Sequence, residues 1–137
     1  MTESEARDFF MRYAEAFTAG DGDAIADLWH TPSALTDTRA GAARVTAWTD
    51  EPPMRANMHA LCEVYADAGP HEWHFELRRL EPLGSHHAFA RVAWTLRRPA
   101  GEFMQHFLTG YQLGLTVAGW RVLFCTAYQE DLSERRR

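Results

Sequence analysis

The sequence contains no lysine, and all 14 of its basic residues are arginines. A Schiff-base mechanism and a phosphate-binding loop each depend on a lysine, so both are excluded. Because 19 acidic residues outnumber the arginines, the formal net charge is −5. A net negative surface does not favour the phosphate backbone of nucleic acids, and we expect no nucleic-acid partner. The only basic run, 135–137, ends the sequence and is expected to be a solvated tail.

Cysteines and long apolar runs are also scarce. The two cysteines, Cys62 and Cys125, are expected to act as small buried hydrophobic residues rather than as a disulfide. No apolar run approaches the ~18 residues of a membrane-spanning helix, so we expect no membrane partner. Charged residues crowd the first twenty positions, which is unlike a signal peptide, and the expected location is cytoplasmic.

The sequence carries no motif for a bound cofactor. It has no glycine-rich phosphate loop, no Gly-x-Ser-x-Gly turn and no cysteine–histidine spacing typical of a metal site. We therefore expect neither a cofactor nor a metal ion.

A chain of 137 residues fits one domain. We assign a single domain to residues 1–137, with a core over about 5–130 and a tail over 131–137.

Apolar residues in the first half recur with helical spacing. The first helix carries them from Ala6 to Phe17, with Ser4 as its expected cap and Gly20 as its stop. A short second helix is expected to include Ile25, Leu28 and Trp29. A third helix is predicted after Asp50, because Pro52 and Pro53 fit a first helical turn. Its apolar face consists of Met54, Met58, Leu61, Cys62 and Tyr65.

The remainder reads as strands. Short strands broken at Gly41 are predicted over residues 34–48, and longer ones over 71–80, 87–97, 103–117 and 120–129. The predicted fold class is α+β, with three N-terminal helices packed on a strongly curved antiparallel or mixed sheet. Such a cone-shaped barrel leaves a small, largely apolar central pocket.

One motif near the N-terminus resembles a known superfamily. It consists of Arg12-Tyr13, Ala16-Phe17-x-x-Gly20-Asp21-x-Asp23-Ala24-Ile25 and Leu28-Trp29, with later support from Ala88-Phe89-Ala90-Arg91-Val92 and Gly119-Trp120-Arg121-Val122. This pattern is similar to the nuclear transport factor 2-like superfamily, which includes ketosteroid isomerases and SnoaL-like polyketide cyclases. The resemblance implies the fold over residues 5–130. It does not imply one activity, because this fold carries many functions.

Comparison with ketosteroid isomerase suggests two catalytic residues. The resemblance places Tyr13 where that enzyme has its oxyanion-hole tyrosine and Asp37 where it has its general base. The enzyme's second carboxylic acid has no counterpart, since Gly110 lies near its position. The alternatives are that Asp37 caps a turn and that Tyr13 is a core residue.

Further candidates come from the strands and from the aromatic residues. His106 is a candidate proton donor or acceptor if Met104, His106 and Leu108 face the pocket, and a buried or interface residue if they do not. Arg91 is a candidate partner for Asp37 or for a ligand carboxylate, or else an exposed strand residue. The remaining candidates for the pocket lining are Trp29, Trp94, Met104 and Met58.

These residues support three hypotheses. In the first, the chain is a pocket protein for a small molecule and acts as a cofactor-independent isomerase, cyclase or dehydratase with Asp37 as base. Alternatively, it binds an apolar metabolite without catalysis, or it is a dimeric association module. In every case the aromatic outer face of the sheet predicts a homodimer.

Overall fold

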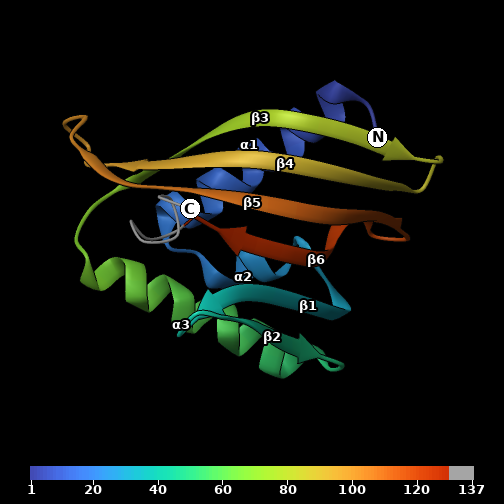
Figure 1. Cartoon of the computed structure of the whole chain (residues 1–137), viewed down its shortest axis with the longest axis horizontal. Helices are drawn as coiled ribbons and strands as arrows, with labels where there is room; N and C mark the ends of the chain where they lie inside the picture. The colour runs from blue at the N-terminus through green and yellow to red at the C-terminus, as the bar shows by residue number, and fades with distance from the viewer. Residues whose placement is uncertain (130–137) are drawn as a thin grey trace.

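A computed structural model describes residues 1–129 and contains three helices and six strands (Figure 1). In chain order these are α1 (Glu3–Ala19), α2 (Gly22–Ala26), β1 (Trp29–Arg39), β2 (Ala42–Trp48), α3 (Glu51–Asp67), β3 (Glu72–Leu83), β4 (His87–Arg97), β5 (Phe103–Thr116) and β6 (Gly119–Tyr128). The predicted α+β class is confirmed. The tail assigned to residues 131–137 lies outside the described residues.

The strands form one mixed sheet in the order β2-β1-β6-β5-β4-β3. All neighbours are antiparallel except β1 and β6, which run parallel. The sheet curls without closing, because β2 and β3 remain its two edges (Figure 1). Figure 1 shows α1 behind β3, β4 and β5, and α3 beside the β1–β2 end.

Helix α1 begins with a reciprocal cap. The Thr2 hydroxyl accepts a hydrogen bond from the Glu5 amide, and the Glu5 carboxylate accepts one from the Thr2 amide. The cap is therefore Thr2, and the expectation of Ser4 is wrong, because Ser4 already lies within the helix. Gly20 ends the helix as predicted, in a left-handed conformation with φ of 65°.

The second helix is shorter than predicted. Asp21 caps it by accepting a hydrogen bond from the Ala24 amide, and it ends at Ala26. Trp29 opens β1 instead of belonging to this helix. Pairing of Trp29 with Val122 of β6 accounts for the difference, since sheet contacts here outweigh the local helical spacing.

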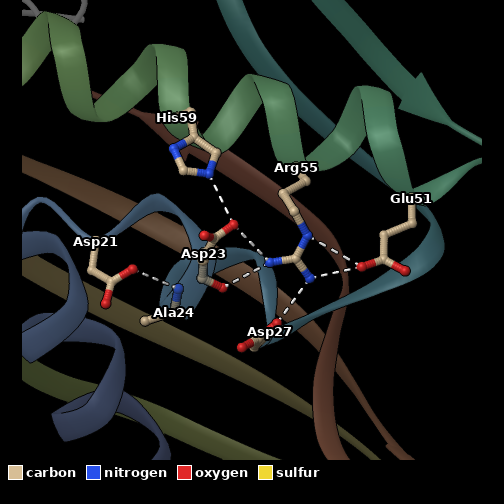
Figure 2. Close-up of polar contacts among 7 residues, drawn as sticks. All are labelled: Asp21, Asp23, Ala24, Asp27, Glu51, Arg55 and His59. Carbon is tan, nitrogen blue, oxygen red and sulfur yellow. Dashed lines mark hydrogen bonds and ion pairs between the residues drawn. The ribbon is translucent and has the colours of Figure 1, made fainter.

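Hydrogen bonds of Arg55 connect α3 to α2 (Figure 2). Its guanidinium donates to the carboxylates of Asp23, Asp27 and Glu51 at 2.7–3.1 Å. One turn farther along α3, the His59 ring contacts the same Asp23 carboxylate at 2.9 Å. Hydrogen bonds from His59 and Arg55 lower the pKa of Asp23 below its ordinary value. These contacts hold α3 against α2.

Strands β1 and β2 form a hairpin around Ala40 and Gly41, which both have positive φ angles. This turn is the predicted break at Gly41. Strand β3 continues to Leu83, beyond its predicted end at residue 80.

Aromatic side chains dominate the core between α1 and the sheet. Trp94 is completely buried, and its ring contacts those of Phe10, Tyr13 and Trp73. The backbone amide of Trp73 donates to the Thr18 hydroxyl at 2.9 Å, which ties β3 to the end of α1. Among residues 1–129, no helix combines the length and apolar character needed to cross a membrane.

Candidate functional site

A cavity of about 170 Å³ lies between the concave face of the sheet and helices α1 and α3. Its walls are Tyr13, Phe17, Leu35, Asp37, Leu61, Tyr65, Trp73, Phe107, Thr109, Tyr111, Cys125 and Ala127. The strand register explains this grouping: Tyr111 pairs with Cys125, and Cys125 pairs with Leu35. Directly paired residues share one face of a sheet, so three strands contribute to the same wall.

Among the described residues, Asp37 is the one carboxylate in this wall. Both of its oxygens accept hydrogen bonds from Arg44 of β2, at 3.1 Å and 2.8 Å. The Asp37 side chain is 21% exposed and that of Arg44 42%, so the pair lies at the rim. Hydrogen bonding to Asp37 raises the pKa of Arg44. Each carboxylate oxygen retains a further lone pair that can accept a proton or a ligand hydrogen bond.

Tyr13 and Tyr111 lie deeper in the cavity wall, and each hydroxyl accepts a hydrogen bond from an indole. Trp29 donates to Tyr13 at 3.3 Å, and Trp94 donates to Tyr111 at 3.0 Å. Because an indole only donates, each phenol keeps its own proton, and Tyr111 donates its proton to the Tyr13 hydroxyl. Burial raises the pKa of both tyrosines well above the ordinary value, and nearby Cys125 adds to the effect. Both phenols are therefore neutral donors at physiological pH.

These pKa shifts predict a loss of stability in alkali. The pKa values of Tyr13 and Tyr111 are higher in the folded chain than in the unfolded chain, where tyrosine ionises near pH ~10. Their contribution is complete below that pH and is lost as the pH rises above it. The free energy of unfolding should fall by about 1.4 kcal/mol per pH unit for each tyrosine. Urea titrations at several pH values measure this dependence. In Tyr13→Phe, the free energy of unfolding should fall less steeply with pH; an unchanged pH dependence would contradict the assignment.

Two wall residues that the sequence analysis did not propose are Trp73 and Thr109. Trp73 is 7% exposed and Thr109 is 2% exposed. Within the described chain, neither the indole nitrogen of Trp73 nor the hydroxyl of Thr109 has a hydrogen-bond partner. Buried polar groups are normally paired, so these two are exceptions in the described core, and neither atom is exposed to the open space of the cavity. A polar residue between Phe107 and Tyr111 on an alternating strand is the signal that identifies Thr109.

Of the two alternatives for His106, the structure favours the one in which this residue lies outside the cavity. Phe107, Thr109 and Tyr111 line the cavity, so alternation along β5 puts His106 and Leu108 on the opposite face. There the His106 ring contacts the Thr95 hydroxyl at 3.2 Å. Met104 sits at the irregular end of the β4–β5 pairing and packs against the core outside the cavity.

The other proposed lining residues are also outside the cavity wall. Met58 is buried in the core. Trp29 and Trp94 contact wall residues without lining the cavity: their indoles donate to Tyr13 and Tyr111, and the Trp94 ring also packs on those of Tyr13 and Trp73. Arg91 is exposed and pairs with Gly110 on β5. The arginine that binds Asp37 is Arg44.

A larger groove of about 550 Å³ adjoins the cavity beyond Phe17 and Tyr65, which line both. It is more open than the cavity and runs between the ends of α1 and α3. The described residues hold no group of three or more His, Cys, Asp or Glu side chains arranged for a metal ion.

The family described as NTF2-like protein (DUF6841) matches residues 3–130. The chain belongs to this NTF2-like family. No curated protein matches the sequence.

Solved structures support the fold assignment of this NTF2-like chain. A Nostoc punctiforme domain of unknown function with a cystatin-like fold is 15% identical, with a TM-score of 0.73 and coverage of 99% of this chain and 83% of that one. A ketosteroid isomerase-like protein from Erwinia carotovora atroseptica is 19% identical, with a TM-score of 0.60 and coverage of 93% and 96%. A putative calcium/calmodulin-dependent protein kinase type II association domain from Thiobacillus denitrificans is 15% identical, with a TM-score of 0.67 and coverage of 87% and 90%. At these identities the likeness concerns the fold alone.

Proposed function

We propose that the chain is a small-molecule-binding protein whose ligand occupies the cavity bounded by Asp37 and Tyr13. The observation that carries this proposal is a partly enclosed, mostly apolar cavity that the Asp37 carboxylate and the Tyr13 phenol both line. A volume of 170 Å³ is close to that of cavities of roughly 150 Å³ that hold a benzene molecule. The cavity itself therefore has room for about one ring.

Filling the cavity should abolish binding. Ala127 lies in the wall on β6, and Ala127→Phe places a ring in the space that the ligand needs. We expect the affinity for one-ring compounds, measured by calorimetry, to fall at least about tenfold. The control is Ala43→Phe on the exposed face of β2, which should bind as the native chain does. Equal affinities for all three proteins would contradict the proposal.

A second candidate function is proton transfer next to a carbonyl group. It is favoured because Asp37 and Tyr13 line the same cavity, so a carboxylate base and a neutral phenol donor can act on one ligand. This arrangement suits a cofactor-independent isomerase, cyclase or dehydratase. The pairing of both Asp37 oxygens with Arg44 favours the non-catalytic binder.

We also propose that the chain forms a homodimer through the outer face of the sheet. Phe89, Gln112 and Phe124 pair in a row across β4, β5 and β6, and Phe124 is 39% exposed. The likeness to a putative association domain supports this proposal. Sedimentation equilibrium should show a dimer that Phe124→Glu weakens at least about tenfold. A native monomer at the highest attainable concentration would contradict it.

A further inference from the structure

The cavity wall combines many aromatic rings with a single negative charge. Among residues 1–129, Asp37 is the one charged residue that lines the cavity. Its side chain is 21% exposed, so a ligand can reach the carboxylate. Half of the lining residues are aromatic, and they come from α1, α3, β3 and β5: Tyr13, Phe17, Tyr65, Trp73, Phe107 and Tyr111.

This combination favours a positive charge inside the cavity. The face of an aromatic ring attracts a cation that lies within about 6 Å of the ring centre. A space of about 170 Å³ is so small that a cation in it lies close to Asp37 and to rings from several elements. An anionic ligand would instead be repelled by Asp37, and no lining residue in the described chain carries a compensating positive charge.

Arg44 reduces the attraction of Asp37 for a cation but does not cancel it. The Arg44 side chain is 42% exposed and does not line the cavity, so water and salt screen its charge. Inside the cavity the other lining side chains are uncharged and mostly apolar, and the charge of Asp37 is screened much less there. Each Asp37 oxygen also keeps a lone pair beyond its bond from Arg44.

We infer that the ligand is a compact ammonium ion, held by the Asp37 carboxylate and by the aromatic rings of the cavity wall. The inference rests on the proposed binding function. A nitrogen that carries methyl groups suits this wall best, because a bare ammonium group loses hydrogen bonds to water that aromatic rings do not replace. Quaternary ammonium ions are the ligands for which sites lined by aromatic rings are best suited.

Two probes of nearly equal shape test the ligand class. Choline carries a trimethylammonium group, and its neutral carbon analogue carries a tert-butyl group in the same place. Calorimetry on the full chain should give at least about tenfold tighter binding of choline, because only its charged group is attracted by Asp37 and by the rings. Phe107→Leu keeps an apolar side chain and removes one ring, so the ratio of the two affinities should fall about threefold.

Charge variants separate an electrostatic role of Asp37 from a structural one. Asp37→Asn should weaken choline binding about tenfold and leave binding of the carbon analogue unchanged. Arg44→Gln removes the competing cation and leaves the carboxylate, so choline should bind about two- to threefold more tightly. A purely structural ion pair predicts instead that both variants weaken both probes. The matched control is Asp67→Asn, which removes an exposed carboxylate at the end of α3 and should change neither affinity.

Equal binding of choline and its carbon analogue would overturn the inference while leaving the binding function intact. Binding of one-ring compounds without any binding of choline would have the same meaning. Equal effects of Asp37→Asn and Asp67→Asn on choline binding would also overturn it, because the cavity carboxylate would then not hold the cation. If neither choline nor any one-ring compound bound the native chain, the proposed function would fail as well.

Discussion

Replacing Trp94 with alanine should reduce the free energy of unfolding by about 3–5 kcal/mol. The Trp94 side chain is completely buried and touches the rings of Tyr13, Trp73 and Phe75. The substitution opens a cavity among these rings, which a close-packed core refills only in part. It also removes the donor to the Tyr111 hydroxyl. Urea unfolding measures the change, and the midpoint of thermal unfolding should fall by about 10–20 °C.

The matched control for this prediction is Trp120→Ala. Trp120 is half-buried, and its indole donates to the Glu5 carboxylate at 3.3 Å, at the surface. Its loss should cost about 1 kcal/mol. Trp94→Phe preserves a ring and removes the N–H, so it separates the hydrogen bond from the packing. Equal losses for the two alanine variants would contradict the central role of Trp94.

Regular periodicity made much of the fold predictable. The helical spacing of apolar residues in α1 and α3 is strong, and Gly20 marks the end of α1 by its backbone conformation. The alternating pattern of β4 is equally clear, because its inward residues are buried and Arg91 and Arg97 are exposed. Local helical spacing did not predict the structure at Trp29, because pairing with β6 places this residue at the start of β1 and not in the second helix.

The orientation of β5 could not be read in the same way. Phe107 and Leu108 are both buried, although they face opposite sides of the sheet. When both faces of a strand are apolar, alternation does not identify the inner one. The sequence therefore leaves the face of His106 open and does not single out Thr109. A further feature, the pairing of Asp37 with Arg44, depends on the register of the β1–β2 hairpin, which the turn at Gly41 alone does not specify.

Asp37→Asn should lower the rate of proton exchange in a bound ketone by about 10²–10⁴-fold if the site is catalytic. The probe is cyclohexanone in heavy water. The Asp37 carboxylate takes a proton from the carbon next to the carbonyl, the electron pair moves to the oxygen, and a solvent deuteron returns to that carbon. Neutral Tyr13 can donate a hydrogen bond to the oxygen as charge develops. Proton NMR follows the loss of the signal.

Two variants separate a base from a structural role of Asp37. Arg44→Gln breaks the ion pair but leaves the carboxylate, so exchange should continue. Asp67→Asn removes an exposed carboxylate at the end of α3 and should not change the rate. If Arg44→Gln and Asp37→Asn reduced exchange equally, Asp37 would act only by holding β2 in place. If the native chain did not accelerate exchange of a ketone that it binds, the cavity would be a binding site without this chemistry.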